Sequence, residues 1–165
     1  MARKLILLVE DHTDSRLILA TVLKRFGYEV CEAADGDEAL KCIEREEPTL
    51  ILLDLALPRT DGWSVASLVR SAFSAADIPI VAVTGRDSLD DRRRAARLGF
   101  SGYFLKPVEP FELLTFVQSL IGPAERRENG ERRTQDRRIQ HLSFPIERRS
   151  GEDRRKLTRR SAVSV

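Results

Sequence analysis

The residues best suited to chemistry in this sequence are three carboxylates, one hydroxyl and one ammonium, each at or just after the end of a short apolar run: Glu10, Asp11, Asp54, Thr84 and Lys106. Three carboxylates brought close together repel one another at neutral pH, so they need a cation or raised pKa values. Because the ligands are all oxygen atoms and no cluster of Cys or His accompanies them, we expect a hard divalent ion, with Mg²⁺ as the first choice. Such an ion commonly also binds a phosphate group, so the pattern indicates phosphate chemistry.

The other side chains of the set suit a phosphoryl group. The ammonium of Lys106 can act as a point charge on one phosphoryl oxygen, and the hydroxyl of Thr84 can donate a hydrogen bond to another. Asp54 is then the candidate nucleophile, which would form an aspartyl phosphate. Catalysis would consist mostly of positioning and charge neutralisation. Each residue alone is more often a turn or cap residue, and it is their joint occurrence that favours a site.

The elements that must position these residues follow from the apolar pattern. We predict strands over 4–9, 28–33, 50–54, 80–84 and 102–105, and helices over about 13–26, 37–47, 62–72, 88–98 and 110–121. Five strands that alternate with five helices through short loops indicate a parallel sheet with helices on both faces. We expect the doubly wound order 2-1-3-4-5, in which all strand ends meet at one edge and a ligand crevice opens between strands 1 and 3.

Within the first predicted helix, Thr13, Asp14 or Ser15 is expected to cap the N-terminus. Its apolar positions are Leu17, Ile18, Val22 and Leu23, with Leu19 and Phe26 at the edges of this face.

Length, composition and charge indicate one domain with an appendage. The chain has 165 residues, of which 42% are hydrophobic. Residues 1–122 carry 15 Lys and Arg against 19 Asp and Glu, whereas residues 123–165 carry 13 against 7. Cys31 and Cys42 lie in apolar segments and are expected to be buried reduced thiols. The apolar run Leu5–Val9 is too short for a signal peptide and no stretch could span a bilayer, so we expect a soluble cytoplasmic protein without membrane partners.

A family resemblance is carried by four motifs. They are Leu-Leu-Val-Glu-Asp at 7–11, Leu-Leu-Asp-Leu-Ala-Leu-Pro at 52–58 followed by Asp61-Gly62, Val-Thr-Gly at 83–85, and Gly-Tyr-Phe-Leu-Lys-Pro at 102–107. Intervals of 43, 30 and 22 residues separate Asp11, Asp54, Thr84 and Lys106. On these motifs, residues 4–121 resemble the receiver (CheY-like) domain of bacterial two-component response regulators. The resemblance implies a flavodoxin-like α/β fold over residues 1–122 and a phosphorelay function.

The resemblance also implies roles for the acidic residues. Asp54 resembles the phosphoacceptor, which is charged from the phosphohistidine of a sensor histidine kinase or phosphotransfer protein. Asp11 resembles the direct Mg²⁺ ligand, with Glu10 acting through water. Ala56 matches the position that lends its backbone carbonyl to the metal, a role that needs no side chain.

Further roles concern the switch. Tyr103 resembles the aromatic residue that turns inward when Thr84 moves toward the phosphoryl group, and Gly85 is in keeping with a small residue that leaves the site open. Lys106-Pro107 resembles a strand end followed by a cis peptide bond. Such a protein is a regulator and not an enzyme, apart from its own phosphorylation and dephosphorylation.

The surface that a downstream protein would read is implied to be the fourth helix, the fifth strand and the fifth helix. The fourth helix carries an unusual run of basic residues: Arg92, Arg93, Arg94 and Arg97. This run is either a solvated face or a docking face for an acidic partner.

The tail, 123–165, has few apolar residues and pairs of Arg interleaved with acids, so we expect it to be disordered. Nucleic-acid or anionic-partner binding through these Arg pairs, regulated by the receiver, is the alternative function. It is disfavoured because the tail has no helix-turn-helix pattern and only Phe144 to stack on bases.

Two other classes of function are also disfavoured by the residues. An aspartate-nucleophile phosphatase needs a second Asp two positions after Asp54, where this chain has Ala56. A flavodoxin-like cofactor binder needs a loop rich in Gly, Ser and Thr after the first strand, where this chain has two acids.

Overall fold

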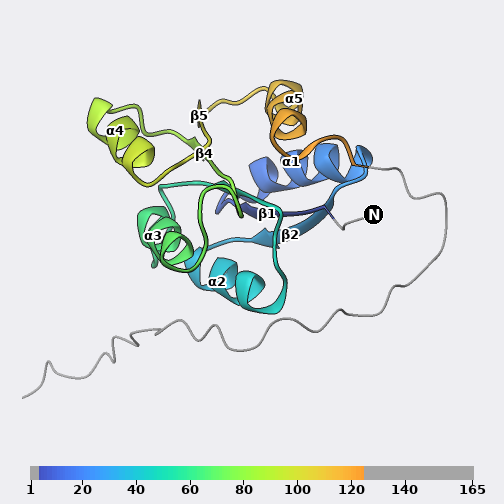
Figure 1. Ribbon diagram of the computed structural model, residues 1–165. Helices are drawn as coiled ribbons and strands as arrows, with labels where there is room; N and C mark the ends of the chain where they lie inside the picture. The colour runs from blue at the N-terminus through green and yellow to red at the C-terminus, as the bar shows by residue number, and fades with distance from the viewer. Residues whose placement is uncertain (1–3, 125–165) are drawn as a thin grey trace, which may run out of the picture.

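A computed structural model describes residues 4–124 of the protein (Figure 1). Its strands are β1 (Leu5–Val9), β2 (Glu29–Ala33), β3 (Leu50–Leu53), β4 (Ile80–Thr84) and β5 (Gly102–Leu105). Its helices are α1 (Thr13–Arg25), α2 (Gly36–Arg45), α3 (Gly62–Ala72), α4 (Leu89–Arg97) and α5 (Pro110–Ile121). The predicted alternation of strand and helix is confirmed, and the element ends agree with the predicted ones to within two residues.

The five strands form one parallel sheet in the order β2-β1-β3-β4-β5, as predicted. The chain reverses its direction of travel across the sheet between β1 and β3, where Val9 pairs in register with Leu53. A crevice therefore opens beyond the carboxyl ends of these two central strands.

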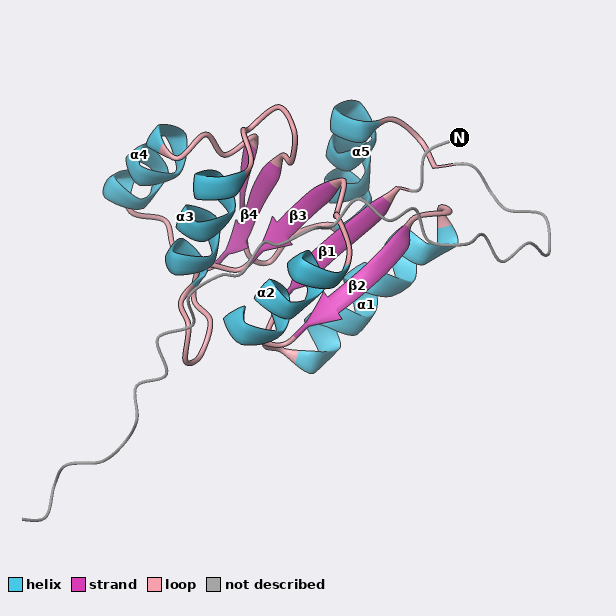
Figure 2. Ribbon diagram, turned by 60° about the horizontal axis from the view of Figure 1, so that its bottom comes forward, coloured by secondary structure: helices cyan, strands magenta, loops and turns pink. Residues whose placement is uncertain are grey.

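Helices cover both faces of the sheet. Figure 1 and Figure 2 show α1 and α5 on one face and α2, α3 and α4 on the other. Alternate residues of each strand point to opposite faces, so Ile6 and Leu8 join the core under α1 and α5, while Leu7 and Val9 join the core under α2 and α3. Both faces of the central strands β1, β3 and β4 are buried, which is why these strand sequences are nearly continuous apolar runs.

The face that α1 buries differs from the predicted one. Leu19, Ala20 and Leu23 are buried, whereas Leu17 and Ile18 are 60% and 53% exposed. The sequence of α1 offers apolar residues on two sides of the helix, and packing against β2 and α5 selects the side that contains Leu23. The predicted cap is also wrong, because His12 is the N-cap residue and no side chain caps the helix.

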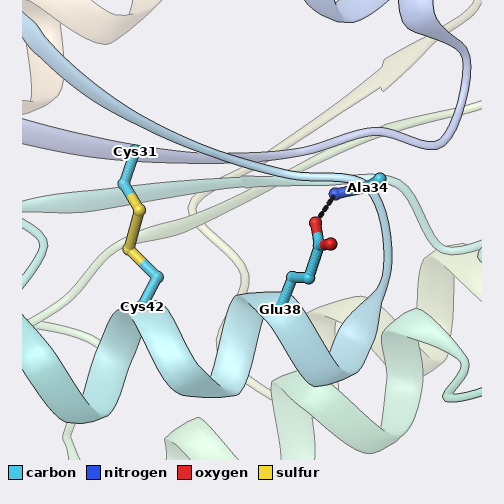
Figure 3. Close-up of a disulfide and its surroundings, with 4 residues drawn as sticks. All are labelled: Cys31, Ala34, Glu38 and Cys42. Carbon is cyan, nitrogen blue, oxygen red and sulfur yellow. Dashed lines mark hydrogen bonds between the residues drawn. A yellow bond between two sulfur atoms is a disulfide. The ribbon is translucent and has the colours of Figure 1, made fainter.

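The two cysteines form a disulfide, so the prediction of reduced thiols is wrong (Figure 3). Cys31 lies on β2 and Cys42, which is fully buried, lies on the face of α2 that covers β2. Their Cα atoms are 6.8 Å apart, at the upper end of the range that a disulfide can bridge. The sequence separation of 11 residues gave no sign of this pairing, because only the docking of α2 on β2 brings the two side chains together.

None of the helices within residues 4–124 is long and apolar enough to cross a membrane. Of the predicted disordered tail, residues 125–165 lie outside the described part of the chain.

Candidate functional site

The backbones of Asp54 and Lys106 continue the hydrogen bonding of the sheet for one residue beyond the strand ends. The Asp54 amide donates to the carbonyl of Val9 at 2.9 Å, and the Lys106 amide donates to the carbonyl of Thr84 at 2.9 Å. These bonds continue the parallel ladder past the ends of β3 and β5, so Asp54 and Lys106 are held as rigidly as strand residues. Sheet edges of this kind position side chains with the precision that phosphoryl chemistry requires.

Lys106 joins two carboxylates from different strands. Its Nζ lies 2.6 Å from Asp54 Oδ2 and 2.6 Å from Glu10 Oε2. The side chains of Glu10 and Asp54 are only 2% and 4% exposed, whereas that of Lys106 is 24% exposed. The predicted convergence of Glu10, Asp54 and Lys106 is therefore confirmed, and so is the cis peptide bond between Lys106 and Pro107.

The electrostatics of Lys106 follow from these contacts. Burial is the largest single influence and lowers its pKa, but the hydrogen bonds and charges of Asp54 and Glu10 together outweigh it, so the pKa of Lys106 is raised. The two carboxylates therefore favour the ammonium form of Lys106.

The loop between β1 and α1 presents the remaining acid. Asp11 is 29% exposed at the crevice, and the Nδ1 atom of the exposed His12 lies 3.0 Å from Asp11 Oδ1. Arg16 on α1 stabilises this loop, since its Nη1 donates a hydrogen bond to the Glu10 carbonyl at 2.6 Å. One ligand atom each of Glu10, Asp11 and His12 lies within 4.8 Å of the others. The contact of His12 with Asp11 was not predicted from the sequence, although the adjacency of the two residues was the available signal.

The loop after β3 turns back over the Asp54 side chain. The Ala56 amide donates to Asp54 Oδ1 at 2.9 Å. A Cβ atom added to Gly62, at the start of α3, would meet the Asp54 carbonyl oxygen and lie 2.7 Å from Leu55 Cα. Gly62 is therefore required for α3 to pack against the backbone of Asp54. The sequence motif contained Gly62 but did not show this packing role.

The oxygen donors of the crevice fit a hard divalent cation. Glu10 and Asp54 supply buried carboxylates, and Asp11 supplies a partly exposed one. Three carboxylates suit Mg²⁺, and the imidazole of His12 lies beside them.

Thr84 connects the crevice to α4. Its side chain is fully buried, and its Oγ1 accepts a hydrogen bond of 3.3 Å from the Arg86 amide. The Tyr103 hydroxyl donates to the Arg86 carbonyl at 2.8 Å. A Cβ atom on Gly85 would meet nothing within 4 Å, so the chain has open space directly after Thr84.

The basic run of α4 is divided between two environments. The guanidinium carbon of Arg92 lies 4.9 Å from the ring centre of Tyr103, and that of Arg94 lies 4.5 Å from the ring centre of Trp63. All four arginines are nevertheless exposed. They differ in their contacts, because two of them also cover aromatic rings of the neighbouring elements.

The fold and the acidic crevice with its bridging lysine are those of a phosphoryl-receiving signalling domain. Residues 6–118 match the response regulator receiver domain family, and the chain belongs to this family. The resemblance inferred from the motifs is therefore confirmed.

Relatives and solved structures agree with this assignment. A probable transcriptional regulator, ycf27, from Porphyridium aerugineum is 38% identical over 121 residues, which are 73% of this chain and 49% of that protein. A CheY-like response regulator receiver domain protein from Methanospirillum hungatei is 31% identical, with a TM-score of 0.68, over 73% of this chain and 94% of the other. The chain spans about half the length of the curated regulators named ycf27 that it matches.

A further solved structure bears on the metal. The receiver domain of a sensor histidine kinase from Pseudomonas aeruginosa was solved with a magnesium ion coordinated in its active site cleft. It is 34% identical, with a TM-score of 0.65, over 73% of this chain and 99% of the other.

Proposed function

We propose that this protein is a phosphoacceptor switch in a two-component or phosphorelay system, with Asp54 as the acceptor. A sensor histidine kinase or a phosphotransfer protein supplies the phosphoryl group, and the phosphorylated receiver changes its binding to a downstream protein. The observation that carries the proposal is the double contact of Lys106 with Asp54 and Glu10 at 2.6 Å each. This arrangement places one cation beside the nucleophile and beside a second carboxylate, in a crevice at the sheet edge.

In the transfer step, an Asp54 carboxylate oxygen forms a bond to phosphorus while the bond from phosphorus to the histidine nitrogen breaks. The imidazole leaves with the electron pair of that bond and takes up a proton. Lys106 neutralises charge on the phosphoryl oxygens, and the Thr84 hydroxyl donates a hydrogen bond to one of them. The rigid backbone of Asp54 holds its carboxylate in line for attack.

A divalent cation belongs to this proposal. Glu10, Asp11, Asp54 and the backbone carbonyl of Ala56 would hold Mg²⁺, which when bound neutralises phosphoryl charge. Support comes from the carboxylates of Glu10 and Asp11, whose ligand atoms lie within 4.8 Å of each other, and from the magnesium ion in the related receiver of Pseudomonas aeruginosa.

The phosphodonor would dock beside the crevice. A groove of about 560 Å³ runs from the crevice between α1 and the start of α5, and its lining includes Glu10 and Lys106 together with Ile18, Pro107 and Val108. The Ile18 side chain that lines it is 53% exposed. An apolar groove that opens directly onto the acceptor suits a helix of the partner that carries the phosphohistidine.

The downstream partner would read α4, β5 and α5, where Arg93 and Arg97 offer exposed positive charge to an acidic surface. The protein would act as a switch and not as an enzyme with its own product, since the side chain two positions after Asp54 is the methyl group of Ala56. The predicted cytoplasmic location stays a prediction.

The test is incubation of the full chain with Mg²⁺ and acetyl phosphate, followed by intact mass measurement. We expect a mass increase of one phosphoryl group in the wild type, none in Asp54→Ala, and the wild-type increase in Asp61→Ala. Asp61 is the matched control because it is an exposed aspartate that caps α3. An unmodified wild type under conditions where Mg²⁺ binds would refute the proposal, as would an adduct that persists in Asp54→Ala.

A further inference from the structure

A continuous set of contacts leads from the crevice to the N-terminal half of α4. Thr84 Oγ1 accepts a hydrogen bond from the Arg86 amide at 3.3 Å. The Arg86 carbonyl in turn accepts a hydrogen bond from the Tyr103 hydroxyl at 2.8 Å. The guanidinium of Arg92 then covers the Tyr103 ring with its carbon 4.9 Å from the ring centre. The amide and the carbonyl of Arg86 belong to successive peptide groups, so the backbone of this one residue links Thr84 to the tyrosine hydroxyl.

The guanidinium of Arg92 is itself held in place. Its Nε and Nη2 atoms both donate to Asp87 Oδ1, at 3.1 Å and 2.8 Å. Asp87 follows Arg86 directly, so the residue that accepts from the Tyr103 hydroxyl and the residue that holds Arg92 are neighbours in the β4–α4 loop. The ring of Tyr103 is therefore fixed at its hydroxyl by one loop residue and at its face, through Arg92, by the next.

The rest of α4 is weakly attached to the domain. Ala95 is its one buried residue, and Leu89 is 71% exposed. A helix that buries so little apolar surface gains little from hydrophobic packing. Besides the buried Ala95 and the ion pair of Arg92 with Asp87, the contacts of Arg92 with Tyr103 and of Arg94 with Trp63 attach α4 to its neighbours.

We propose that Arg92 is a positioning residue for Tyr103, which holds the ring against the β4–α4 loop and thereby sets how strongly Thr84 is coupled to α4. The proposal rests on the proposed function in that Thr84 is taken to sense the phosphoryl group. Guanidinium–ring contacts at exposed sites change a two-state equilibrium by about two- to five-fold. An effect of this size tunes a switch without abolishing it.

The first measurement needs no phosphorylation. The chain has two tyrosines, so labelling with 3-fluorotyrosine yields two fluorine NMR signals, and Tyr28→Phe assigns them. In Arg92→Ala we expect the Tyr103 signal to move toward that of free fluorotyrosine. Asp87→Asn is expected to move it in the same direction, because Arg92 loses its anchor. Arg93→Ala, one position away and paired with Asp90 in the first turns of α4, is the matched control and leaves the signal in place.

A second readout separates positioning from plain charge. The pKa of Tyr103 is raised, first by burial and then by the charge of Asp91, while Arg92 acts to lower it and Asp87 to raise it. Arg92→Ala therefore raises this pKa further and Asp87→Asn lowers it, although both free the ring. If the fluorine signal moves in opposite directions in these two variants, charge alone explains it and the positioning role is wrong.

The last measurement concerns coupling. Mg²⁺ and acetyl phosphate are expected to shift Tyr103 between two positions, which give two separate signals or one averaged signal. The shift in this equilibrium is expected to be about two- to five-fold smaller in Arg92→Ala than in the wild type. A wild-type response in both Arg92→Ala and Asp87→Asn would overturn the proposal. If the wild type itself takes up no phosphoryl group, the proposed function fails, whereas the first two measurements still test the placement of the ring.

Discussion

Replacing Lys106 with methionine removes the ammonium from the crevice while keeping a side chain of similar length. Glu10 and Asp54, with side chains 2% and 4% exposed, then face each other without the cation that lies 2.6 Å from both. Loss of one partner from a buried ion pair costs about 3–5 kcal/mol. Because the Lys106 side chain is itself 24% exposed, water compensates part of the loss, and we expect about 3 kcal/mol.

Urea unfolding in the presence of EDTA measures this cost. With a dependence of about 2 kcal/mol per molar urea, a loss of about 3 kcal/mol lowers the midpoint by about 1.5 M. Excess Mg²⁺ is expected to restore more stability to Lys106→Met than to the wild type, since no ammonium competes for the carboxylates and ligand binding stabilises the folded state. Lys41→Met, which changes an exposed lysine of α2, should unfold at the wild-type midpoint.

The pH dependence has a definite sign. The folded pKa of Lys106 is raised above its ordinary value of 10.5, so its stabilising contribution is fully present below pH 10.5 and is lost as the pH rises through the folded pKa. The difference in unfolding free energy between wild type and Lys106→Met is therefore constant at neutral pH and narrows above pH 10.5. The reasoning is refuted if Lys106→Met matches the wild-type midpoint in EDTA, or if Lys41→Met loses as much.

Two further predictions follow from packing. Gly62→Ala is expected to lose at least about 2 kcal/mol in urea unfolding, since the new Cβ meets backbone atoms of residues 54 and 55, whereas Gly85→Ala changes stability by less than about 1 kcal/mol because its Cβ enters open space. Equal stabilities of the two variants would contradict the contact. For the disulfide, we expect iodoacetamide to modify neither cysteine without reductant and, after reduction, to modify the half-buried Cys31 before the fully buried Cys42. Modification of both without reductant would show that the disulfide is absent.

The sequence alone determined the sheet and most of the crevice. Continuous apolar runs of four or five residues identify strands buried on both faces, and alternation with amphipathic segments requires parallel pairing. Once the strand order is known, the residue after each strand must lie at the same edge. The convergence of Asp54, Glu10 and Lys106 was therefore predictable without any coordinates.

Only the tertiary structure decided which side of a helix is buried and what its side chains contact. The apolar residues of α1 occupy two sides, and the sheet selected Leu19 and Leu23 over Leu17 and Ile18. The basic run of α4 looked like a single charged face, yet Arg92 covers Tyr103. Periodicity tells how residues are arranged around one element, but it does not tell which neighbour that element meets.

The disulfide illustrates the same division. Cys31 and Cys42 are apolar-patterned positions in a strand and in the helix that follows it, which the sequence shows directly. Their pairing depends on the angle and height at which α2 rests on β2, and these are set by side-chain volumes throughout the core under α2 and α3. Backbone order is thus encoded locally in the pattern of apolar residues, whereas contacts between side chains of different elements are decided by how the whole core packs.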